Sequence, residues 1–332
     1  MKIRIISFTE RGLELAERLG RGLDGEAVRC GGAVALQEWT ELAFREAEGL
    51  VFVGAAGIAV RAVAPHVRSK TGDPAVVAVD ETGQYAIPLL SGHLGGANDL
   101  ARRIAALCGA VPVITTATDL RGVFAVDEWA RYQGCLVRNP ERIRAVSSAL
   151  LAGGIITLRS DFPIAGTPPE GVVVTEESGC DVLLSLRTAG PDVLQLIPEI
   201  VVLGVGCRRG TAPEDLESAF RTLCAGGGIS EDAVRMVCSI DRKADEPGLL
   251  EFCRNRGLEL KTFTALELQA VPGTYSSSEF VLSVTGADNI CERSAVLGSG
   301  GTLLIPKTAG NGITMALAIK EPSLQWKGAV NG

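Results

Sequence analysis

The sequence predicts an α/β protein made of two α/β domains with mostly parallel sheets, joined by a small middle segment. Two observations lead to this prediction. Short apolar runs typical of buried strands alternate with helical patterns over residues 1–138, and the same alternation returns over residues 199–322. Prolines interrupt residues 139–198, which are expected to be a variable middle segment with a linker, and residues 323–332 are expected to form a tail.

The elements of the N-terminal domain are expected where apolar patterns are clearest. Strands are predicted at 2–8, 50–54, 75–80 and 111–115, where apolar and β-branched residues run together. Helices are predicted at 12–19, 58–64, 97–108 and 126–132, and Gly109 and Gly134 stop the last two. Strands that alternate with helices in this way imply a parallel sheet covered on both faces.

The middle segment and the C-terminal domain follow in order. The middle segment has a predicted helix at 141–151, strands at 154–158 and 172–175, and a linker at 188–198. In the C-terminal domain, strands are predicted at 201–205, 234–240, 260–263, 302–305 and 313–319. Two capping boxes, Thr211 with Glu214 and Thr264 with Glu267, mark helix starts, and another helix begins at Pro247 and ends before Gly257.

The overall composition argues against several classes of protein. The 332 residues include 32 Lys and Arg against 39 Asp and Glu, and a net charge of −7 disfavours a nucleic-acid partner. No apolar run reaches the roughly 18 residues that a membrane span needs. No signal peptide is visible either. We therefore expect a cytoplasmic protein with neither a nucleic-acid nor a membrane partner.

The cysteines and histidines argue against a resident metal. The nine cysteines are odd in number and include no C-x-x-C pair, which is typical of neither a disulfide framework nor a zinc site and suits a reducing compartment. Because His66 and His93 are the only two histidines, a three-histidine metal site is excluded. We expect no bound metal.

Three glycine-rich stretches contain basic residues and no Asp or Glu. They are residues 54–72, residues 204–211 and residues 293–320, and the last two include Arg208 and Lys307. Backbone N–H groups at glycine turns, with Arg and Lys nearby, bind carboxylate or phosphate groups. The alternative for each stretch is a set of solvated side chains on ordinary turns.

One of these stretches resembles a dinucleotide-binding fingerprint without matching it. The segment from Gly204 to Gly210 reads G-x-G-x-x-x-G, one residue longer than the G-x-G-x-x-G pattern. A nicotinamide-dependent oxidoreductase is therefore only an alternative. Within the segment, Cys207 lies beside Arg208, which is able to lower a thiol pKa, but a lone cysteine is more often inert.

Two residues are candidates for acid–base chemistry. His93 lies in a glycine-rich loop just before a predicted helix, where helix N–H groups can hold an oxyanion and the helix dipole is expected to lower the imidazole pKa. The alternative is a histidine that braces the turn. Glu292 is the second candidate, and its alternative is an exposed ion pair with Arg293. His66, at a predicted helix end, is interpreted as structural.

Long blocks of the sequence resemble a known enzyme family. Residues 54–67, 73–105 and 112–130 resemble the N-terminal domain of the cobalt-precorrin-5A hydrolase family of anaerobic cobalamin biosynthesis. Residues 203–211, 239–253, 271–281 and 286–307 resemble the C-terminal domain of the same family. The blocks occur in family order and span nearly the whole chain.

The resemblance implies a hydrolase that opens the ring-A δ-lactone of cobalt-precorrin-5A and releases acetaldehyde to give cobalt-precorrin-5B. This tetrapyrrole carries many carboxylates and its own cobalt, and water is the co-substrate, so no cofactor is expected. The expected catalytic residues are His93 and Glu292. Residues expected to bind the substrate are Gly54, Gly57, Arg61, Ser91, Gly95, Gly96, Thr115, Thr116, Gly206, Cys207, Arg208, Lys243, Ser278, Glu279, Asn289, Arg293 and Lys307.

Two expectations complete the interpretation. The basic glycine segments of both domains are expected to face one cleft, because clefts between domains are common ligand sites. The partners expected are the substrate and neighbouring enzymes of the cobalamin pathway. A second alternative to the hydrolase is a non-catalytic tetrapyrrole carrier, which would bind cobalt-precorrin-5A without releasing acetaldehyde.

Overall fold

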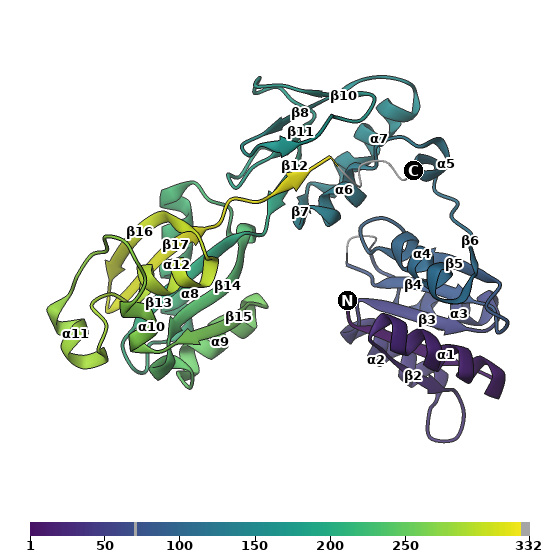
Figure 1. The fold of residues 1–332 in the computed structure, drawn as a ribbon, viewed down its shortest axis with the longest axis horizontal. Coiled ribbons are helices and arrows are strands. Elements are labelled where there is room, and N and C mark those ends of the chain that lie inside the picture. Colours follow the sequence, from purple (N-terminus) through teal and green to yellow (C-terminus); the bar gives the residue numbers. More distant parts are fainter. Residues whose placement is uncertain (70–71, 327–332) are drawn as a thin grey trace.

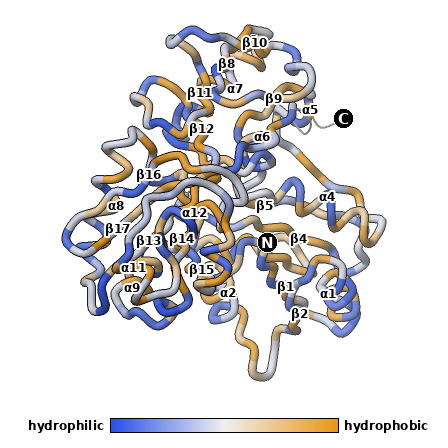
Figure 2. The backbone as a smooth tube through the Cα atoms, turned by 60° about the vertical axis from the view of Figure 1, so that its left-hand side comes forward, coloured by the Kyte–Doolittle hydropathy of each residue, from blue (hydrophilic) through white to orange (hydrophobic). Residues whose placement is uncertain are grey.

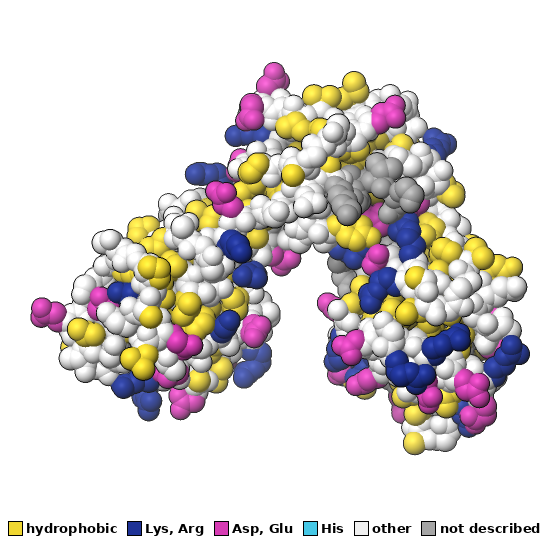
Figure 3. Space-filling model, viewed as in Figure 1, with side chains coloured by type: hydrophobic (Ala, Val, Ile, Leu, Met, Phe, Trp, Pro, Cys, Tyr) yellow, Lys and Arg dark blue, Asp and Glu magenta, His cyan; other side chains and the backbone are white. Residues whose placement is uncertain are grey.

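The computed structural model describes residues 1–69 and 72–326, which form three units, each with its own main sheet (Figure 1). Strands and helices interleave along the chain and most neighbouring strands are parallel, which confirms the predicted α/β class. Figure 3 shows the N-terminal and C-terminal units as separate lobes on either side of an open gap, with the middle unit above them.

The N-terminal unit is a six-stranded sheet in the order β2-β1-β3-β4-β5-β6. Its elements are β1 (Ile3–Ser7), α1 (Glu10–Leu23), β2 (Gly25–Arg29), α2 (Leu36–Glu46), β3 (Gly49–Val53), α3 (Ala56–Val63), β4 (Ala75–Val79), β5 (Tyr85–Leu90), α4 (Ala97–Cys108) and β6 (Val111–Pro112). Helices α1 and α4 pack on one face, and α2 and α3 pack on the other. All five residues of β3 and of β4 are buried, as expected for central strands. Figure 2 shows the hydrophobic colour of β4.

The middle unit has a five-stranded sheet in the order β10-β8-β11-β12-β7. Its elements are α5 (Ala117–Arg121), α6 (Val126–Tyr132), β7 (Cys135–Arg138), α7 (Ile143–Leu151), β8 (Ile156–Ser160), β9 (Ile164–Ala165), β10 (Val172–Val174), β11 (Val182–Leu184) and β12 (Leu194–Pro198). Strand β12, which lies in the predicted linker, is buried throughout. Strand β7 pairs with β12 and so belongs to the middle unit, although β7 lies before the expected domain boundary at 138. The middle segment thus has a core of its own.

Residues of the expected tail belong to this middle unit. Strand β18 (Leu324–Gln325) pairs with β9, and the Trp326 ring stacks on Trp129 with ring centroids 5.1 Å apart. The indole N–H of Trp129 donates to the carbonyl of Gln325 at 2.9 Å. Residues 327–332 of the expected tail lie outside the described residues.

The C-terminal unit is a five-stranded sheet in the order β15-β14-β13-β17-β16. Its elements are β13 (Val201–Cys207), α8 (Pro213–Gly227), β14 (Val234–Ile240), α9 (Pro247–Arg256), β15 (Glu259–Phe263), α10 (Ala265–Gln269), α11 (Glu279–Thr285), α12 (Cys291–Ser299), β16 (Thr302–Gly310) and β17 (Ile313–Ile319). Helices α8 and α9 cover one face of this sheet. The other face is covered in part by α12, which contacts β13, β14 and β17.

The two predicted capping boxes have different outcomes. The box of Thr264 and Glu267 is confirmed, with both reciprocal hydrogen bonds present at the start of α10. The box of Thr211 and Glu214 is wrong, because α8 begins one residue later at Pro213 and the Thr211 hydroxyl donates instead to the carbonyl of Arg208 at 2.8 Å.

The two glycines of the G-x-G motif allow α12 and β17 to lie close to β13. A Cβ added at Gly204 would lie 1.8 Å from the carbonyl oxygen of Cys291, and one added at Gly206 would lie 2.6 Å from the hydroxyl of Thr314. Steric demands within the protein therefore account for both glycines. No phosphate needs to be invoked, which weakens the nicotinamide alternative.

Among the helices within residues 1–69 and 72–326, none combines the length and the apolar character that crossing a membrane requires.

Candidate functional site

A pocket of about 660 Å³ opens in the C-terminal unit where β13 and β14 end. These two strands are parallel, so their carboxyl ends meet at one edge of the sheet, which is where α/β sheets usually bind ligands. Helix α11 and the β16–β17 hairpin supply other walls. Six residues expected to bind the substrate line this pocket: Gly206, Cys207, Arg208, Lys243, Asn289 and Lys307.

The lining of this pocket is strongly basic. Five cations, Arg208, Arg209, Arg242, Lys243 and Lys307, face it together with a single carboxylate, that of Asp288. Asp288 is already paired with Arg293 at 2.7 Å, and Lys243 is paired with Glu246 at 2.7 Å. Across the described parts of the chain, no carboxylate forms an ion pair with the remaining four cations. The pocket therefore has a surplus of positive charge available to a ligand.

The thiol of Cys207 is neutral at physiological pH. Burial raises its pKa above the ordinary value, and Lys243 only partly opposes this effect. The structure agrees with the inert alternative for this cysteine, because desolvation outweighs the effect of the nearby cation on the thiol pKa. A neutral thiol is a poor nucleophile, so the geometry favours a role for Cys207 in lining the pocket.

Lys243 is held firmly at the pocket wall. Its side chain is 13% exposed, and its partner Glu246 also accepts a hydrogen bond from the Gly210 amide at 2.7 Å. Burial alone would raise the pKa of Glu246, but the hydrogen bonds from Lys243 and Gly210 outweigh it and lower this pKa. The ionised carboxylate thus fixes both the lysine and the loop that follows β13.

Glu292 lies behind the pocket and does not line it. It is 3% exposed, and its carboxylate accepts hydrogen bonds from the Ser276 amide and hydroxyl, both at 2.9 Å, from the Asn289 amide group at 2.6 Å and from the Lys307 amide at 2.8 Å. Burial would raise the pKa of Glu292, but these donors outweigh it and lower the pKa. This geometry favours a structural role that joins α12 to two walls of the pocket.

We expect Glu292→Gln to lower the free energy of unfolding by about 1–3 kcal/mol, because an amide nitrogen would face donors that a carboxylate accepts. Denaturant unfolding measures this loss, and Glu251→Gln, at an exposed site on α9, is the matched control. Turnover per folded molecule is expected to stay near that of the wild type. A hundredfold loss of turnover without a loss of stability would return Glu292 to the acid–base role that the sequence predicts.

Three other residues expected to bind substrate lie beside the pocket. Arg293 is 7% exposed, pairs with Asp288 and donates to the carbonyl of Val271 at 2.9 Å, so its guanidinium is fully engaged within the protein. Ser278 caps α11 by accepting from the Val281 amide at 3.3 Å, and Glu279 is the exposed first residue of that helix.

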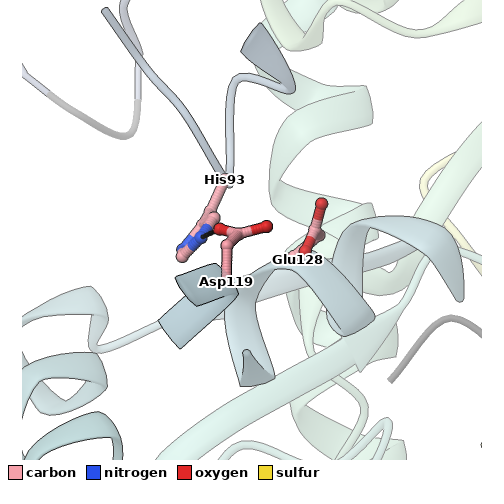
Figure 4. Close-up of side chains that lie close together, drawn as sticks. All are labelled: His93, Asp119 and Glu128. Carbon is pink, nitrogen blue, oxygen red and sulfur yellow. Dashed lines mark hydrogen bonds and ion pairs between the residues drawn. The ribbon is translucent and has the colours of Figure 1, made fainter. Parts of the chain in front are cut away.

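His93 lies in the N-terminal unit, in a cluster of charged groups (Figure 4). It follows β5, and its Nε2 atom lies 2.9 Å from Asp119 Oδ2 while its Nδ1 atom lies 3.3 Å from Asp127 Oδ1. Asp119 is on α5 and Asp127 on α6, so the imidazole joins the N-terminal unit to the first helices of the middle unit.

The expectation of a lowered His93 pKa is wrong. Burial favours the neutral imidazole, but the carboxylates of Asp119 and Asp127 outweigh it and raise the pKa of His93 to about 10. The helix dipole has a smaller effect than these two charges. A group that is protonated at physiological pH does not accept a proton, so this geometry favours a structural ion pair for His93.

Three ligand atoms in this cluster have the spacing of a metal site. His93, Asp119 and Glu128 each offer one, and these atoms lie within 4.8 Å of one another. However, Arg102 pairs with Asp119 and, at 3.3 Å, with Glu128. Since this guanidinium and the imidazolium already pair with the carboxylates that a metal would need, the cluster is not expected to hold a metal.

The other N-terminal residues expected to bind substrate are distributed over three places. Ser91, Gly95 and Gly96 form the loop around His93, and Thr116 donates to Asp119 beside exposed Thr115. Gly54 lines a pocket of about 300 Å³, near Gly57 at the start of α3, and Arg61 lines one of about 440 Å³ between α2 and α3. Arg61 and Lys307 line separate pockets, and the cleft that both domains are expected to share stays a prediction.

Among the lining residues of the large pocket that the sequence interpretation missed are Arg209, Arg242, Phe280 and Val284. Arg209 belongs to the acid-free stretch at 204–211 and is adjacent to Arg208, so the same argument from charge could have predicted Arg209 as a pocket residue. Phe280 and Val284 lie in an apolar stretch that follows three consecutive serines, a pattern that sequence alone does not separate from an ordinary buried helix.

Comparisons with known proteins place the chain in a family. Residues 38–119 match the family described as Cobalamin synthesis G N-terminal, and residues 201–318 match Cobalamin synthesis G C-terminus. The chain is 32% identical to a cobalt-precorrin-5A hydrolase of Salmonella typhimurium over 341 residues, which covers 96% of this chain and 97% of that protein. The chain belongs to the cobalt-precorrin-5A hydrolase family.

Other relatives have the same extent. A cobalt-precorrin-5A hydrolase of Priestia megaterium is 28% identical, with 95% of this chain and 94% of that protein covered. A solved structure of a cobalamin biosynthesis protein G homologue from Sulfolobus solfataricus has 23% identity and a TM-score of 0.43, and the comparison covers 96% of this chain and 97% of that one. The large pocket lies within the part that matches the C-terminal model of the cobalt-precorrin-5A hydrolase family.

Proposed function

We propose that this protein is a cobalt-precorrin-5A hydrolase that binds its substrate in the large C-terminal pocket. Membership of the family supports the reaction, and the surplus of cations in the pocket supports the site. The substrate is a macrocycle with several carboxylates, and Arg and Lys side chains without protein partners are suited to charge-assisted hydrogen bonds with such groups. A cytoplasmic location and contacts with neighbouring enzymes of the pathway remain predictions.

The residues of the pocket have different proposed roles. Arg208 and Lys307, which lack carboxylate partners among the described residues, bind substrate carboxylates. Lys243 is fixed by Glu246, and its ammonium group is suited to stabilise negative charge that develops on the lactone carbonyl oxygen. Cobalt enters as part of the substrate, and water is the co-substrate.

The proposed reaction has two stages. Water adds to the lactone carbonyl and the ring C–O bond breaks, which leaves a carboxylate and a hydroxyl group. The hydroxyl then loses its proton, the adjacent C–C bond breaks, and acetaldehyde leaves while the electron pair passes into the conjugated macrocycle, which takes up a proton. Oxyanion stabilisation serves the first stage, and the macrocycle itself accepts the electrons of the second.

Incubation of the purified protein with cobalt-precorrin-5A tests this proposal. We expect one acetaldehyde, trapped with a carbonyl reagent, for each substrate consumed, and the same mixture without protein gives the blank. Binding without acetaldehyde above the blank would contradict the hydrolase and support the carrier alternative. Enhanced fluorescence of a reduced nicotinamide nucleotide on titration with the protein would instead support the oxidoreductase alternative.

A further inference from the structure

Helix α11 differs from the other helices of the C-terminal unit in its exposure. None of its residues is buried, and Phe280, Leu282 and Val284 are 77%, 44% and 50% exposed. Figure 1 shows α11 at the outer edge of the unit, away from the sheet. Only Val281 of this helix packs against a hydrophobic core, so Phe280 and Val284 are available for contact with a ligand.

One face of α11 points into the large pocket. Phe280, Val281, Val284 and Thr285 line it, and their spacing of one, three and four residues is that of a single helix face. The helix is held at its ends: the Ser278 amide donates to the carbonyl of Asp288 at 3.0 Å, and Arg242 donates to the carbonyl of Val284 at 2.5 Å. The helix therefore keeps a defined place while its apolar face stays uncovered.

Other parts of the pocket lining are basic. Arg208 and Arg209 follow β13, and Lys307 lies on β16, each without a carboxylate partner in the described residues. A pocket that is lined both by an apolar helix face and by cations complements a ligand with an apolar body and a carboxylate edge. A tetrapyrrole that bears acetate and propionate groups has this character, whereas a nucleotide or a small organic acid lacks the broad apolar face.

We infer that α11 is the apolar wall against which the face of the bound macrocycle packs, with Phe280 as its main contact residue, while the cations of the pocket pair with the carboxylates. The inference rests on the proposed function for the identity of the ligand. Burial of an exposed phenyl ring against the macrocycle contributes to affinity in proportion to the apolar area removed from water.

Binding of uroporphyrin III, a stable tetrapyrrole with eight carboxylates, tests the inference through its own fluorescence anisotropy. We expect Phe280→Ala to weaken binding about tenfold, because most of a phenyl contact is lost. Leu266→Ala is the matched control: Leu266 is 84% exposed on α10, and it does not line the pocket. Binding by the control is expected to equal that of the wild type.

A second probe separates the two walls. Benzene hexacarboxylate carries carboxylates but no macrocycle. Its own affinity, obtained from competition with uroporphyrin, should be weakened by Arg208→Ala and unaffected by Phe280→Ala. Equal uroporphyrin binding by wild type and Phe280→Ala would overturn the inference, while a loss on Arg208→Ala alone would leave the proposed pocket intact. Wild-type protein that releases acetaldehyde but does not bind uroporphyrin would overturn the inference and leave the proposed function standing.

An exposed apolar helix face is also able to bind a second copy of this chain. Analytical sedimentation of the same variants tests this by measuring their molecular mass in solution. We expect wild type and Phe280→Ala to have the same molecular mass in solution. A wild-type dimer that Phe280→Ala converts to a monomer would show that α11 is covered by another copy, and would overturn the inference.

Discussion

Replacing Asp119 by asparagine is expected to lower the free energy of unfolding by about 1–3 kcal/mol, because donors that converge on this carboxylate lose their acceptor, although His93 keeps Asp127 and Arg102 keeps Glu128 as partners. The Asp119 side chain is 6% exposed and accepts from His93, Asn98, Arg102 and Thr116. Denaturant unfolding measures the loss, and Asp192→Asn, at an exposed loop position, is the control. Equal losses in the two variants would contradict the importance of this cluster.

The same cluster gives a pH dependence whose sign follows from the His93 pKa. Since folding raises this pKa from 6.5 to about 10, the folded state binds the proton more tightly than the unfolded state. The stabilisation is complete below pH 6.5 and is lost as the pH rises towards 10. We expect His93→Asn to be less stable at pH 6 and to lack this decline.

His93→Asn also tests the catalytic role that the sequence predicts. A general base contributes roughly 10²–10⁴-fold to turnover, so its loss would be evident in the fraction that remains folded. Because the structure holds the imidazole protonated, we expect reduced stability with turnover per folded molecule close to that of the wild type. A turnover loss in the general-base range, at unchanged stability, would place His93 in the mechanism.

Replacing Arg208 and Lys307 together by alanine is expected to raise KM about a hundredfold with a much smaller effect on kcat. Each lost charge-assisted contact weakens binding about tenfold, and two separate contacts add in free energy. Carboxylates far from the lactone are bound alike in the ground and transition states, so KM changes more than kcat.

The control for this pair is Arg254→Ala, at an exposed position on α9 that does not line the pocket. Wild-type KM should also rise with salt, because ions screen exposed charge pairs over about 8–10 Å near 0.1–0.15 M. A fall in kcat at unchanged KM would place Arg208 or Lys307 at the reacting atoms instead.

The fold was predictable where burial dictates composition. Strands β3, β4 and β13 consist almost wholly of apolar residues because they lie centrally in their sheets. Strand β2 was missed because it is a partly exposed edge strand containing Glu26 and Arg29, and β5 was missed because Pro88 interrupts it. At such positions, neighbours distant in sequence determine the structure, and local pattern carries little of that information.

The site was predictable to the extent that charge segregates along the chain. Arg208 and Lys307, which come from two of the acid-free stretches, line one pocket, and their contact with substrate stays a prediction. The environment of His93 was not predictable, because the two carboxylates that raise its pKa are distant in sequence, Asp119 by 26 residues and Asp127 by more. Likewise, the four donors around Glu292 come from segments before and after it, and only the fold shows that they converge on one carboxylate.

The pairing of β9 with β18 gives the middle unit an unusual order of completion during synthesis. Trp129 and Gln325, joined by a hydrogen bond, are 196 residues apart. Trp129 therefore leaves the ribosome well before Trp326, which stacks on its ring, and Gln325, which accepts the hydrogen bond from its indole N–H. The whole C-terminal unit is translated in between. Domains usually fold as units in the order of their synthesis. Here, the hydrophobic core of the middle unit is complete only after the C-terminal unit has been synthesised, because Leu324 and Trp326 belong to that core.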